Sequence, residues 1–370
     1  MMNENGYAKK VSVIVPIYNG EKILEKSLFI LSEQTLDDIE FICVNDASTD
    51  GSLNMLMAFK AVFGDKFVII DSPKNGGPGG ARNLGLKYAR GEYIGFMDQD
   101  DYVHKDMFRD MYNEAKNGDY DIVKCSWYDK KRNRAAKLNS FVGELDDYRK
   151  MIFYATDSYF IWNKIYKSEL ISDMSMKFRE NTYNDDIDFF IEAILRAKRA
   201  STVNKAYYYW NFEGESLSRG IKDFDLTKVI KTNADMLDIL RKRVSLSPNR
   251  EIGKYFYEEE AVFSIRRIYY NMFFKEELQL SEYEGFKIFA LKYVGDYSEL
   301  KNEGNRGFKE LQLSELIFKT IDEEPVNMLK NVLRLKMDFI DGKFGEEYKE
   351  IFCNNQFGSN IVGGFDCIEK

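Results

Sequence analysis

The sequence predicts an α/β fold, in which a mostly parallel β-sheet is flanked by helices, followed by a mainly helical second domain. Over the first hundred residues, short apolar runs rich in β-formers alternate with helical patterns, as expected of parallel strands joined by crossover helices. Polar clusters follow these apolar runs. Beyond about residue 220 the β signal fades and apolar residues recur at helical spacing, which predicts the change of architecture.

The predicted elements follow one another in a regular order along the first half of the chain. The expected strands span residues 11–17, 39–44, 67–70 and 93–97, and the expected helices span 23–31, 51–63 and 81–90. A less regular stretch suggests strands at 121–127 and 207–210, with helices near 144–154 and 186–199. The polar clusters after the strands should therefore lie at the carboxyl edge of the sheet, where open α/β sheets bind ligands.

The second domain is predicted from two apolar helical faces. Leu226, Ile230, Leu237 and Leu240 lie on the first, and Leu329, Val332, Leu333 and Ile340 on the second. An Asn/Gly-rich stretch at 354–364 resembles a loose tail. We therefore divide the chain into residues 1–220 and 221–370, in line with the two or three domains expected of 370 residues at roughly 150 residues each.

Charge and composition exclude several functional classes. The 53 Lys and Arg residues are outnumbered by 61 Asp and Glu residues, and the net charge of -8 gives no general attraction to nucleic acid or anionic lipid. The single histidine, His104, excludes metal sites that need two histidines. Carboxylates must therefore carry most acid–base chemistry, and no nucleic-acid partner is expected.

The cysteines and the hydropathy pattern indicate the compartment. Four cysteines without C-x-x-C spacing are interpreted as buried thiols in a reducing compartment: Cys43, Cys125, Cys353 and Cys367. Residues 1–10 contain no apolar segment of a signal peptide, and no stretch approaches the roughly 18 apolar residues that span a bilayer. A cytoplasmic protein is expected, and a peripheral contact with the inner face of the membrane stays open, for instance through the aromatic and basic segment 266–274.

The strongest chemical signal is the segment FMDQDD at residues 96–101, which places Asp98, Asp100 and Asp101 at the end of an apolar strand. Like charges this close repel one another unless a cation or water screens them. Mg²⁺ or Mn²⁺ would fit, because such ions are held by one or two carboxylates together with substrate phosphates. The turn thus predicts a diphosphate-bearing substrate. The alternative is a solvated turn in which Asp101 complements the dipole of a helix starting near Lys105.

Two further polar segments follow strands. In VNDASTDGS, Asp46 could accept a hydrogen bond from the N–H of a pyrimidine base, while Ser48 or Asp50 caps the next helix. The glycine loop at 76–80 leads to Arg82, and it would let backbone amides approach a ligand and place a cation at a helix start. A plain flexible loop is the alternative to this ligand-binding role.

A further acidic group enters an apolar helix. Asp185 and Asp186 lie at the start of the segment NDDIDFF, where they either include a catalytic carboxylate or only complement the helix dipole. His104, which follows Asp100 closely, is either a contact of the metal site or a surface residue at a helix start. The sequence pattern alone leaves both choices open.

Seven segments occur in the order and at the distances typical of one enzyme family. They are VSVIVPIYNG, VNDASTDGS, NGGPGGARNLGL, GEYIGFMDQDDY, WNKIYKSEL, NDDIDFF and YYYWNFEGESLSR. On these motifs, residues 10–220 resemble the family 2 glycosyltransferases, which have a GT-A fold, a Rossmann-like and mostly parallel sheet flanked by helices. The resemblance implies a nucleotide-diphosphate-sugar donor, most often UDP-linked, inversion at the anomeric carbon, and Mn²⁺ or Mg²⁺ as a cofactor.

The resemblance also assigns residues to donor binding: Pro16, Tyr18, Asn19, Asp46, Gly79, Arg82, Asp98, Gln99, Ser216 and Arg219. Within this set, Pro16, Tyr18 and Asp46 match positions at which the family holds the base and ribose. Arg82 matches a position that meets the base or the diphosphate, and the last two residues match a loop that closes over the diphosphate.

Metal, catalytic and acceptor roles follow from the same resemblance. Asp98 and Asp100 match the D-x-D motif, in which Asp100 is the expected metal contact and Asp98 lies nearer the ribose or sugar. Asp186 is the expected catalytic base and Asp185 its alternative, because the two occupy the place of the family's Glu-Asp pair. The residues assigned to the acceptor side are Trp162, Asn163 and Lys164.

The chain departs from the family pattern at three positions. Asn45 replaces the usual first aspartate of the second motif, Asp185 replaces a glutamate, and Lys105 replaces a frequent proline. The first change concerns only the ribose contacts. The second leaves the choice between Asp185 and Asp186 open.

The resemblance therefore implies an inverting glycosyltransferase that moves a hexose or N-acetylhexosamine by direct displacement, with an Asp base and a metal at the departing diphosphate. Its acceptor would be a hydroxyl of a glycan, glycolipid, polyol phosphate or glycoprotein, as in cell-surface polysaccharide biosynthesis. The helical domain would shape the acceptor site or a homo-oligomer contact.

Two alternatives to this function stay open. One is a nucleotide-sugar-binding protein of the same fold without turnover, since the motifs predict binding better than catalysis. The other is a sugar nucleotidyltransferase, which also carries acids at strand ends. It would need a basic glycine-rich loop after the first strand, where no cation precedes Lys22.

Overall fold

The structure is a computed structural model of the chain. It describes residues 6–130, 133–146, 148–155, 158–171, 176–182, 185–211, 225–246 and 279–294, and the single residues 257, 261, 264, 268 and 272. The chain divides into two compact units, residues 1–214 and 215–370, each of which is described by itself. The predicted boundary at residue 220 lies a few residues beyond this division.

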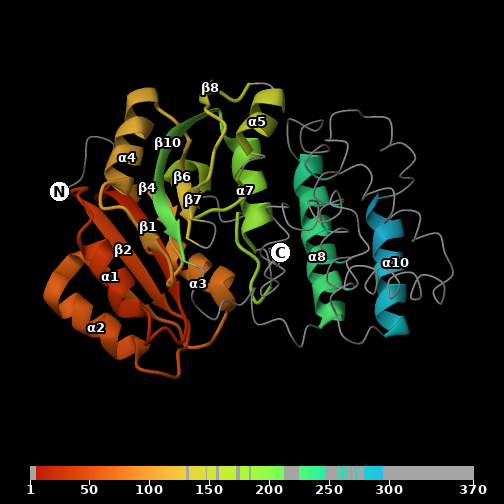
Figure 1. The fold of residues 1–370 in the computed structure, drawn as a ribbon, viewed down its shortest axis with the longest axis horizontal. Helices are drawn as coiled ribbons and strands as arrows, with labels where there is room; N and C mark the ends of the chain where they lie inside the picture. Colours follow the sequence, from red (N-terminus) through yellow and green to blue (C-terminus); the bar gives the residue numbers. More distant parts are fainter. Residues whose placement is uncertain are drawn as a thin grey trace, which may run out of the picture. The chain divides into compact units, whose positions relative to one another are not determined.

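The first four strands form the parallel part of the sheet, in the spatial order β3-β2-β1-β4 (Figure 1). They are β1 (Lys9–Ile17), β2 (Ile39–Asn45), β3 (Phe67–Asp71) and β4 (Gly91–Phe96). All four were predicted from their apolar runs, to within about two residues at each end. Because β1, β2 and β4 are parallel neighbours, the segments that follow them meet at one edge of the sheet.

The rest of the sheet is mixed. Its strands are β5 (Tyr102–Val103), β6 (Ile122–Asp129), β7 (Arg134–Ala135), β8 (Val142–Glu144), β9 (Lys164–Lys167) and β10 (Arg199–Trp210). Strand β9 pairs antiparallel with both β4 and β6, and it thereby joins the two halves of the sheet. Of the nine strand pairings in the described residues, five are antiparallel, but these are short, whereas β6 and β10 form a long parallel pair, so the predicted, mostly parallel sheet is confirmed with antiparallel additions in its second half.

The helices of the first unit pack on both faces of this sheet. They are α1 (Leu24–Ser32), α2 (Ser52–Phe63), α3 (Gly77–Leu86), α4 (Met107–Gly118), α5 (Tyr148–Ala155), α6 (Ser168–Ile171) and α7 (Asp185–Arg196), with a 3₁₀ turn at Gly64–Lys66. Helix α3 begins four residues before the predicted start at 81, because Pro78 occupies its first turn, where the missing N–H of proline is not needed.

Alternate residues of β1 face opposite sides of the sheet. On one side, Val13 packs in a buried cluster with Leu28 of α1, Leu56 of α2 and Phe108 of α4. These helices therefore cover one face, and the apolar periodicity of their sequences serves this core.

The opposite face of the sheet is covered by α3 and α7. Gly85 of α3 lies so close to β1 and β2 that a Cβ atom there would come within 2.6 Å of Ile14 and 3.3 Å of Val44. On α7, Phe189 stacks on Phe178 with a centroid distance of 4.0 Å and meets Phe96 of β4 edge-on. Both helices thus begin next to the carboxyl ends of the parallel strands.

Two helices of the second unit are described, α8 (Leu226–Leu246) and α10 (Leu280–Val294). They contact each other through Asp238 of α8, which accepts hydrogen bonds from Lys292 and from the Tyr293 hydroxyl. Leu226, Leu237 and Leu240 are buried and Ile230 is partly buried, as the predicted face of this helix requires. The second predicted face, the tail at 354–364 and most of the segment 266–274 lie outside the described residues.

None of the helices in the described part of the chain has both the length and the apolar character needed to cross a membrane.

Candidate active site

The predicted ligand-binding segments meet at the carboxyl edge of the parallel strands. Ile17, the last residue of β1, pairs with Asn45 at the end of β2, and Ile14 pairs with Phe96 at the end of β4. The segments that begin at Tyr18, Asp46 and Met97 are therefore neighbours. The strand-end rule correctly brings the first, second and fourth motifs to one place.

The loop after β1 is fastened to the acidic turn after β4. The Gln99 side chain accepts the backbone N–H of Tyr18 at 3.0 Å, and its amide donates to the Tyr18 carbonyl oxygen at 3.1 Å. Gln99, predicted to bind the donor, is thus committed to the protein backbone. The Tyr18 ring is 45% exposed, and it remains available to pack against a planar ligand.

Asn19 joins the loops after β1 and β2. It adopts the left-handed backbone conformation at φ +47°, which Asn tolerates better than most residues. Its N–H donates to Ser48, and its side-chain oxygen accepts the N–H of Thr49. Asp50 accepts the N–H of Ser52, so Asp50 rather than Ser48 serves the start of α2.

Pro16 is a buried strand residue opposite Val44. It lies beyond Ile14, the last residue of β1 that pairs with β4, so its missing N–H removes no bond to that strand. The structure thus gives Pro16 a structural position behind the loop that carries Tyr18.

Asp46 holds the glycine loop. Its Oδ1 atom accepts the N–H of Gly76 at 2.9 Å, and its side chain is almost fully buried. Burial raises the pKa of the Asp46 carboxyl, and hydrogen bonds from the amides of Gly76 and Gly77 oppose part of this rise. Beside it, Asn45 donates to Asp71 of β3.

The glycine loop is packed against protein and does not form an open cradle for a ligand. A Cβ atom at Gly79 would lie 2.0 Å from the carbonyl oxygen of Arg179 and 3.1 Å from the Asp185 carboxylate. Gly77 has a φ of +70° and faces Asn181. Because this space is filled, Gly79 leaves no room for a side chain, and its expected contact with a donor stays a prediction. The glycines let α3 approach the segment that precedes α7.

Arg82 is the centre of the site. Its Nη1 atom donates to Asp185 at 2.6 Å, and its Nη2 atom donates to Asp98 at 2.8 Å. Burial disfavours its charge, but the Asp185 and Asp98 carboxylates raise the pKa of Arg82 above its usual range. Within the described residues, its buried Nε atom has no hydrogen-bond partner. One cation thus joins α3, the acidic turn and the start of α7.

The two aspartates at the start of α7 have different surroundings. Asp185 is buried against Arg82, whereas Asp186 is partly exposed. Removal from water, and then the charge of Asp185, raise the pKa of Asp186 to about 7. Burial also raises the pKa of Asp185, against the opposing charge of Arg82. These two environments favour Asp186 as the proton acceptor and Asp185 as a partner of Arg82.

Asp101 is an important residue whose role the sequence did not reveal. It does not serve a helix start, because α4 begins only at Met107. Asp101 is 1% exposed. Its carboxylate accepts hydrogen bonds from the hydroxyl of Tyr208, near the end of β10, and from the backbone N–H of Asn211, which directly follows β10. Burial, followed by the charges of Asp100 and Asp98, raises the pKa of Asp101 well above its usual range.

The three residues assigned to the acceptor side are buried. Trp162 stacks on Tyr208 with a centroid distance of 4.2 Å. Asn163 donates to the Cys125 carbonyl oxygen, and Lys164 donates to backbone and side-chain oxygens of Ser158. The expected contact of Asn163 and Lys164 with an acceptor is therefore wrong, since both side chains have no exposed surface.

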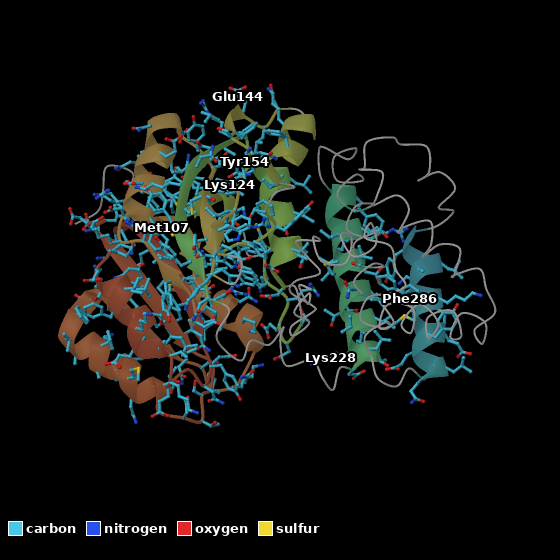
Figure 2. All side chains as sticks on the ribbon, viewed as in Figure 1. Met107, Lys124, Glu144, Tyr154, Lys228 and Phe286 are labelled. Carbon is cyan, nitrogen blue, oxygen red and sulfur yellow. The ribbon has the colours of Figure 1, made fainter. Side chains whose placement is uncertain are left out.

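A second buried lysine lies directly opposite Lys164 in the sheet. Lys124 of β6 is the register partner of Lys164 of β9. Its ammonium group donates to the Tyr154 carbonyl oxygen at 2.6 Å and lies 4.3 Å above the Tyr154 ring, and both residues are labelled in Figure 2. Hydrogen bonds to backbone carbonyl oxygens thus offset the burial of both ammonium groups in the mixed half of the sheet.

The Nδ1 atom of His104 accepts the N–H of Asp106 at the start of α4, which agrees with the helix-start interpretation. Ser216 and Arg219 lie outside the described residues. Cys43 and Cys125 are buried, and burial raises the pKa of each thiol to about 12.

The acidic turn fits a cation that the substrate helps to hold. Among the described residues, no group of three His, Cys, Asp or Glu side chains could bind a metal ion by itself. Asp98 shares one oxygen with Arg82, and Asp100 lies two residues further along the same turn. Mg²⁺ and Mn²⁺ sites with one or two protein carboxylates are completed by substrate phosphates and water.

Comparison with known proteins finds a family that matches part of the first unit. Residues 12–174 match the sequence profile described as glycosyl transferase family 2. An uncharacterized glycosyltransferase of Bacillus subtilis, EpsJ, is 32% identical over 217 residues, which cover 56% of this chain and 62% of that protein. A poly(ribitol-phosphate) beta-glucosyltransferase of Bacillus spizizenii is 32% identical over 225 residues, or 56% of this chain and 33% of that protein. The chain thus spans less than two thirds of the length of these relatives.

The fold is shared with a solved enzyme structure. Residues 1–349 of Staphylococcus aureus TarS in complex with UDP-GlcNAc superpose with a TM-score of 0.68 at 23% identity, over 90% of this chain and 92% of that one. This likeness extends the similarity in fold beyond the region matched by the family profile. Residues 12–174 thus match glycosyltransferase family 2, and the first unit has the GT-A fold.

Proposed function

We propose that the protein is an inverting glycosyltransferase that moves a sugar from a UDP-linked donor to an acceptor hydroxyl. The observation that carries this proposal is the Arg82 bridge, which holds Asp98 of the acidic turn and Asp185 beside the base candidate Asp186. One cation thereby joins the acidic turn to the residue that precedes the proposed proton acceptor. The match of residues 12–174 to the family 2 profile supports the reaction class.

The donor would bind at the carboxyl edge of β1, β2 and β4. The exposed Tyr18 ring could pack against the base, and Asp46 lies at the neighbouring strand end. The unsatisfied Nε–H of Arg82 could serve an anionic oxygen. The TarS structure holds UDP-GlcNAc and a second one holds UDP, which supports a uridine nucleotide as the first donor to test.

A divalent cation, Mn²⁺ or Mg²⁺, would be held by Asp100 with Asp98 and would stabilise the charge that develops on the departing diphosphate. Arg82 adds a fixed positive charge to the same side of the site. Because it is already paired with two carboxylates, it is oriented before any donor binds.

Asp186 would take the proton from the acceptor hydroxyl. Its pKa of about 7 means that about half of the carboxyl is deprotonated at neutral pH and that the carboxylate is basic enough to accept a proton. Attack by the oxygen on the side opposite the leaving diphosphate inverts the anomeric carbon. The proton moves to Asp186, the glycosidic bond forms, and the bond to the diphosphate breaks.

The relatives suggest which acceptor class to test first. Poly(ribitol phosphate) is the acceptor named for the Bacillus spizizenii relative, so polyol phosphates head the panel, followed by glycans, glycolipids and glycoproteins. The second unit is proposed to shape the acceptor site or an oligomer contact. A cytoplasmic location at the inner face of the membrane would give access to such acceptors.

The test measures transfer and binding separately. Asp186→Asn should reduce turnover with a UDP-sugar and Mn²⁺ by about a hundredfold or more, since general-base assistance contributes 10² to 10⁴-fold. UDP binding in calorimetry should remain. Asp119→Asn is the control, because the Asp119 side chain is 78% exposed and pairs with Lys167 outside the proposed site.

Two outcomes would contradict the proposal. Turnover of Asp186→Asn equal to that of the wild type would remove Asp186 as the base. UDP binding by the wild type without hydrolysis or transfer of any nucleotide sugar in the panel would instead support a binding protein of this fold without turnover.

A further inference from the structure

The acidic turn after β4 is attached to the end of β10 by four hydrogen bonds. The Tyr208 hydroxyl donates to Asp101 Oδ2 at 2.6 Å and accepts the N–H of Asp98 at 3.3 Å. The N–H of Asn211 donates to Asp101 Oδ1 at 2.8 Å, and its side-chain amide donates to the Asp100 carbonyl oxygen at 3.1 Å. Three residues of the turn are thus held from one strand end.

The Tyr208 ring is itself fixed by aromatic packing. Trp162 stacks on the Tyr208 ring with an interplanar angle of 21°. Phe160 in turn stacks on Trp162, with a centroid distance of 4.7 Å. Tyr208 has no exposed surface, and Trp162 is 5% exposed. The hydroxyl therefore has a defined position, because the ring that carries it cannot turn away without breaking this packing.

We propose that Asp101 and Tyr208 are positioning residues for donor binding, which hold the turn so that Asp98 pairs with Arg82 and Asp100 presents its carboxylate to a cation-bound diphosphate. This inference rests on the proposed function. It also gives the motif containing Trp162 a role: through Tyr208, Trp162 supports the donor side of the site.

A purely structural link would not need a carboxylate here. Burying a charged group away from water is costly, and apolar side chains of similar size usually join two elements at least as well. The Asp101 carboxylate accepts one hydrogen bond from the Tyr208 side chain and one from the backbone of Asn211. These directional bonds fix the orientation of the acidic turn as well as its contact with β10. Direction matters for a turn whose other carboxylates must meet a ligand.

The test compares two buried tyrosines that each lose only a hydroxyl group. Tyr208→Phe removes the bonds to Asp98 and Asp101. Tyr93→Phe is the matched control, since Tyr93 is 1% exposed and its hydroxyl donates to the Tyr120 carbonyl oxygen at 3.0 Å, near the amino end of β4. Both variants should lose thermal stability to a similar extent.

Calorimetry with UDP and Mn²⁺ gives the deciding measurement. We expect Tyr208→Phe to bind UDP about tenfold more weakly and to need more Mn²⁺ for half-maximal binding, whereas Tyr93→Phe should match the wild type. Asp101→Asn, which keeps the size of the side chain, should behave like Tyr208→Phe. UDP affinity of both variants equal to that of the wild type would overturn the inference.

Other results separate the inference from the proposed function. A wild type that binds no UDP in the presence of Mn²⁺ would overturn the proposed donor and with it this role. Equal losses of UDP affinity in Tyr208→Phe and Tyr93→Phe would contradict the positioning role. The same holds if Asp101→Asn and Tyr208→Phe both fail to fold, because Asp101 and Tyr208 would then serve stability alone.

Discussion

The raised pKa of Asp186 means that its ionised form destabilises the folded chain. Its pKa is about 7 in the folded chain, because it is withdrawn from water beside Asp185, and about 3.9 in an unfolded chain. Between these values the folded state holds a proton that the unfolded state has lost. Stability therefore falls as the pH rises from about 4 to 7, and above 7 the loss is complete.

Asp186→Asn should accordingly be more stable than the wild type, because the amide has no charge to bury. We expect the Tm of Asp186→Asn to exceed that of the wild type by about 2 °C more at pH 8 than at pH 6. Over this interval the wild type loses stability equivalent to roughly one pKa unit. Thermal unfolding at the two pH values measures it. A difference in Tm that does not change with pH would contradict the raised pKa of Asp186.

Arg82 depends on the shape of its guanidinium group as well as on its charge. Arg82→Lys keeps the charge but offers a single nitrogen, which cannot donate to Asp98 and Asp185 as the two Nη atoms do. We expect kcat/KM to fall tenfold or more. Arg109→Lys is the control, since Arg109 also binds two carboxylates, Asp106 and Asp110, but outside the site. An active Arg82→Lys would show that charge alone is sufficient.

At the scale of elements, the site depends on how closely α3 approaches the segment before α7. The Arg82 bridge spans these two elements, and Gly79 is the point at which they touch most closely. The site is therefore sensitive to side-chain volume in the first turn of α3, which carries none of its charged groups.

Gly79→Ala should destabilise the chain by about 1–3 kcal/mol, because its Cβ atom would lie 2.0 Å from the Arg179 carbonyl oxygen. UDP affinity should fall with it as Asp185 is displaced from Arg82. Gly80→Ala is the control in the same helical turn: its Cβ atom would be 3.6 Å from Glu180, an ordinary contact, and alanine is the better helix former. Urea unfolding should show that Gly79→Ala lowers the free energy of unfolding and that Gly80→Ala raises it. Equal free energies of unfolding for the two variants would refute the close contact.

At the scale of the whole molecule, the parallel half of the sheet was predictable and the mixed half was not. Strands β1 to β4 are apolar runs bounded by turns, a signal that depends only on local sequence. Strand β9 has four residues, two of them lysines, so nothing in Lys164–Lys167 indicates a buried strand. Its position is fixed by pairing with β4 and β6, which lie far away in the sequence.

The candidate site shows the same division. Tyr18, Asp46, Asp98 and Asp186 could be predicted because their motifs follow strands or open a helix. Asp101 could not be assigned its role, since its partner Tyr208 lies 107 residues further along the chain. The packing of the glycine loop against residues 179–181 could not be predicted, because open space and space filled by another segment give the same sequence pattern.

The two edges of the parallel sheet should separate function from stability. At the amino edge, the fully buried Glu40 of β2 accepts hydrogen bonds from the Ser12 hydroxyl and from the backbone and guanidinium of Arg90. Arg90 immediately precedes β4, so this network ties three neighbouring strands together at their starts. The groups proposed to bind the donor all follow the opposite ends of these strands.

Glu40→Gln should therefore lower the free energy of unfolding by about 1–3 kcal/mol, because each carboxylate oxygen accepts two of the four hydrogen bonds and the amide nitrogen that replaces one oxygen can accept neither of its two. UDP affinity in the presence of Mn²⁺, measured well below the Tm, should equal that of the wild type. Glu144→Gln on β8, whose side chain is exposed and labelled in Figure 2, should change neither quantity. A loss of UDP affinity in Glu40→Gln would mean that disorder at the amino edge reaches the site through β1 and β4, and the two edges would then be coupled.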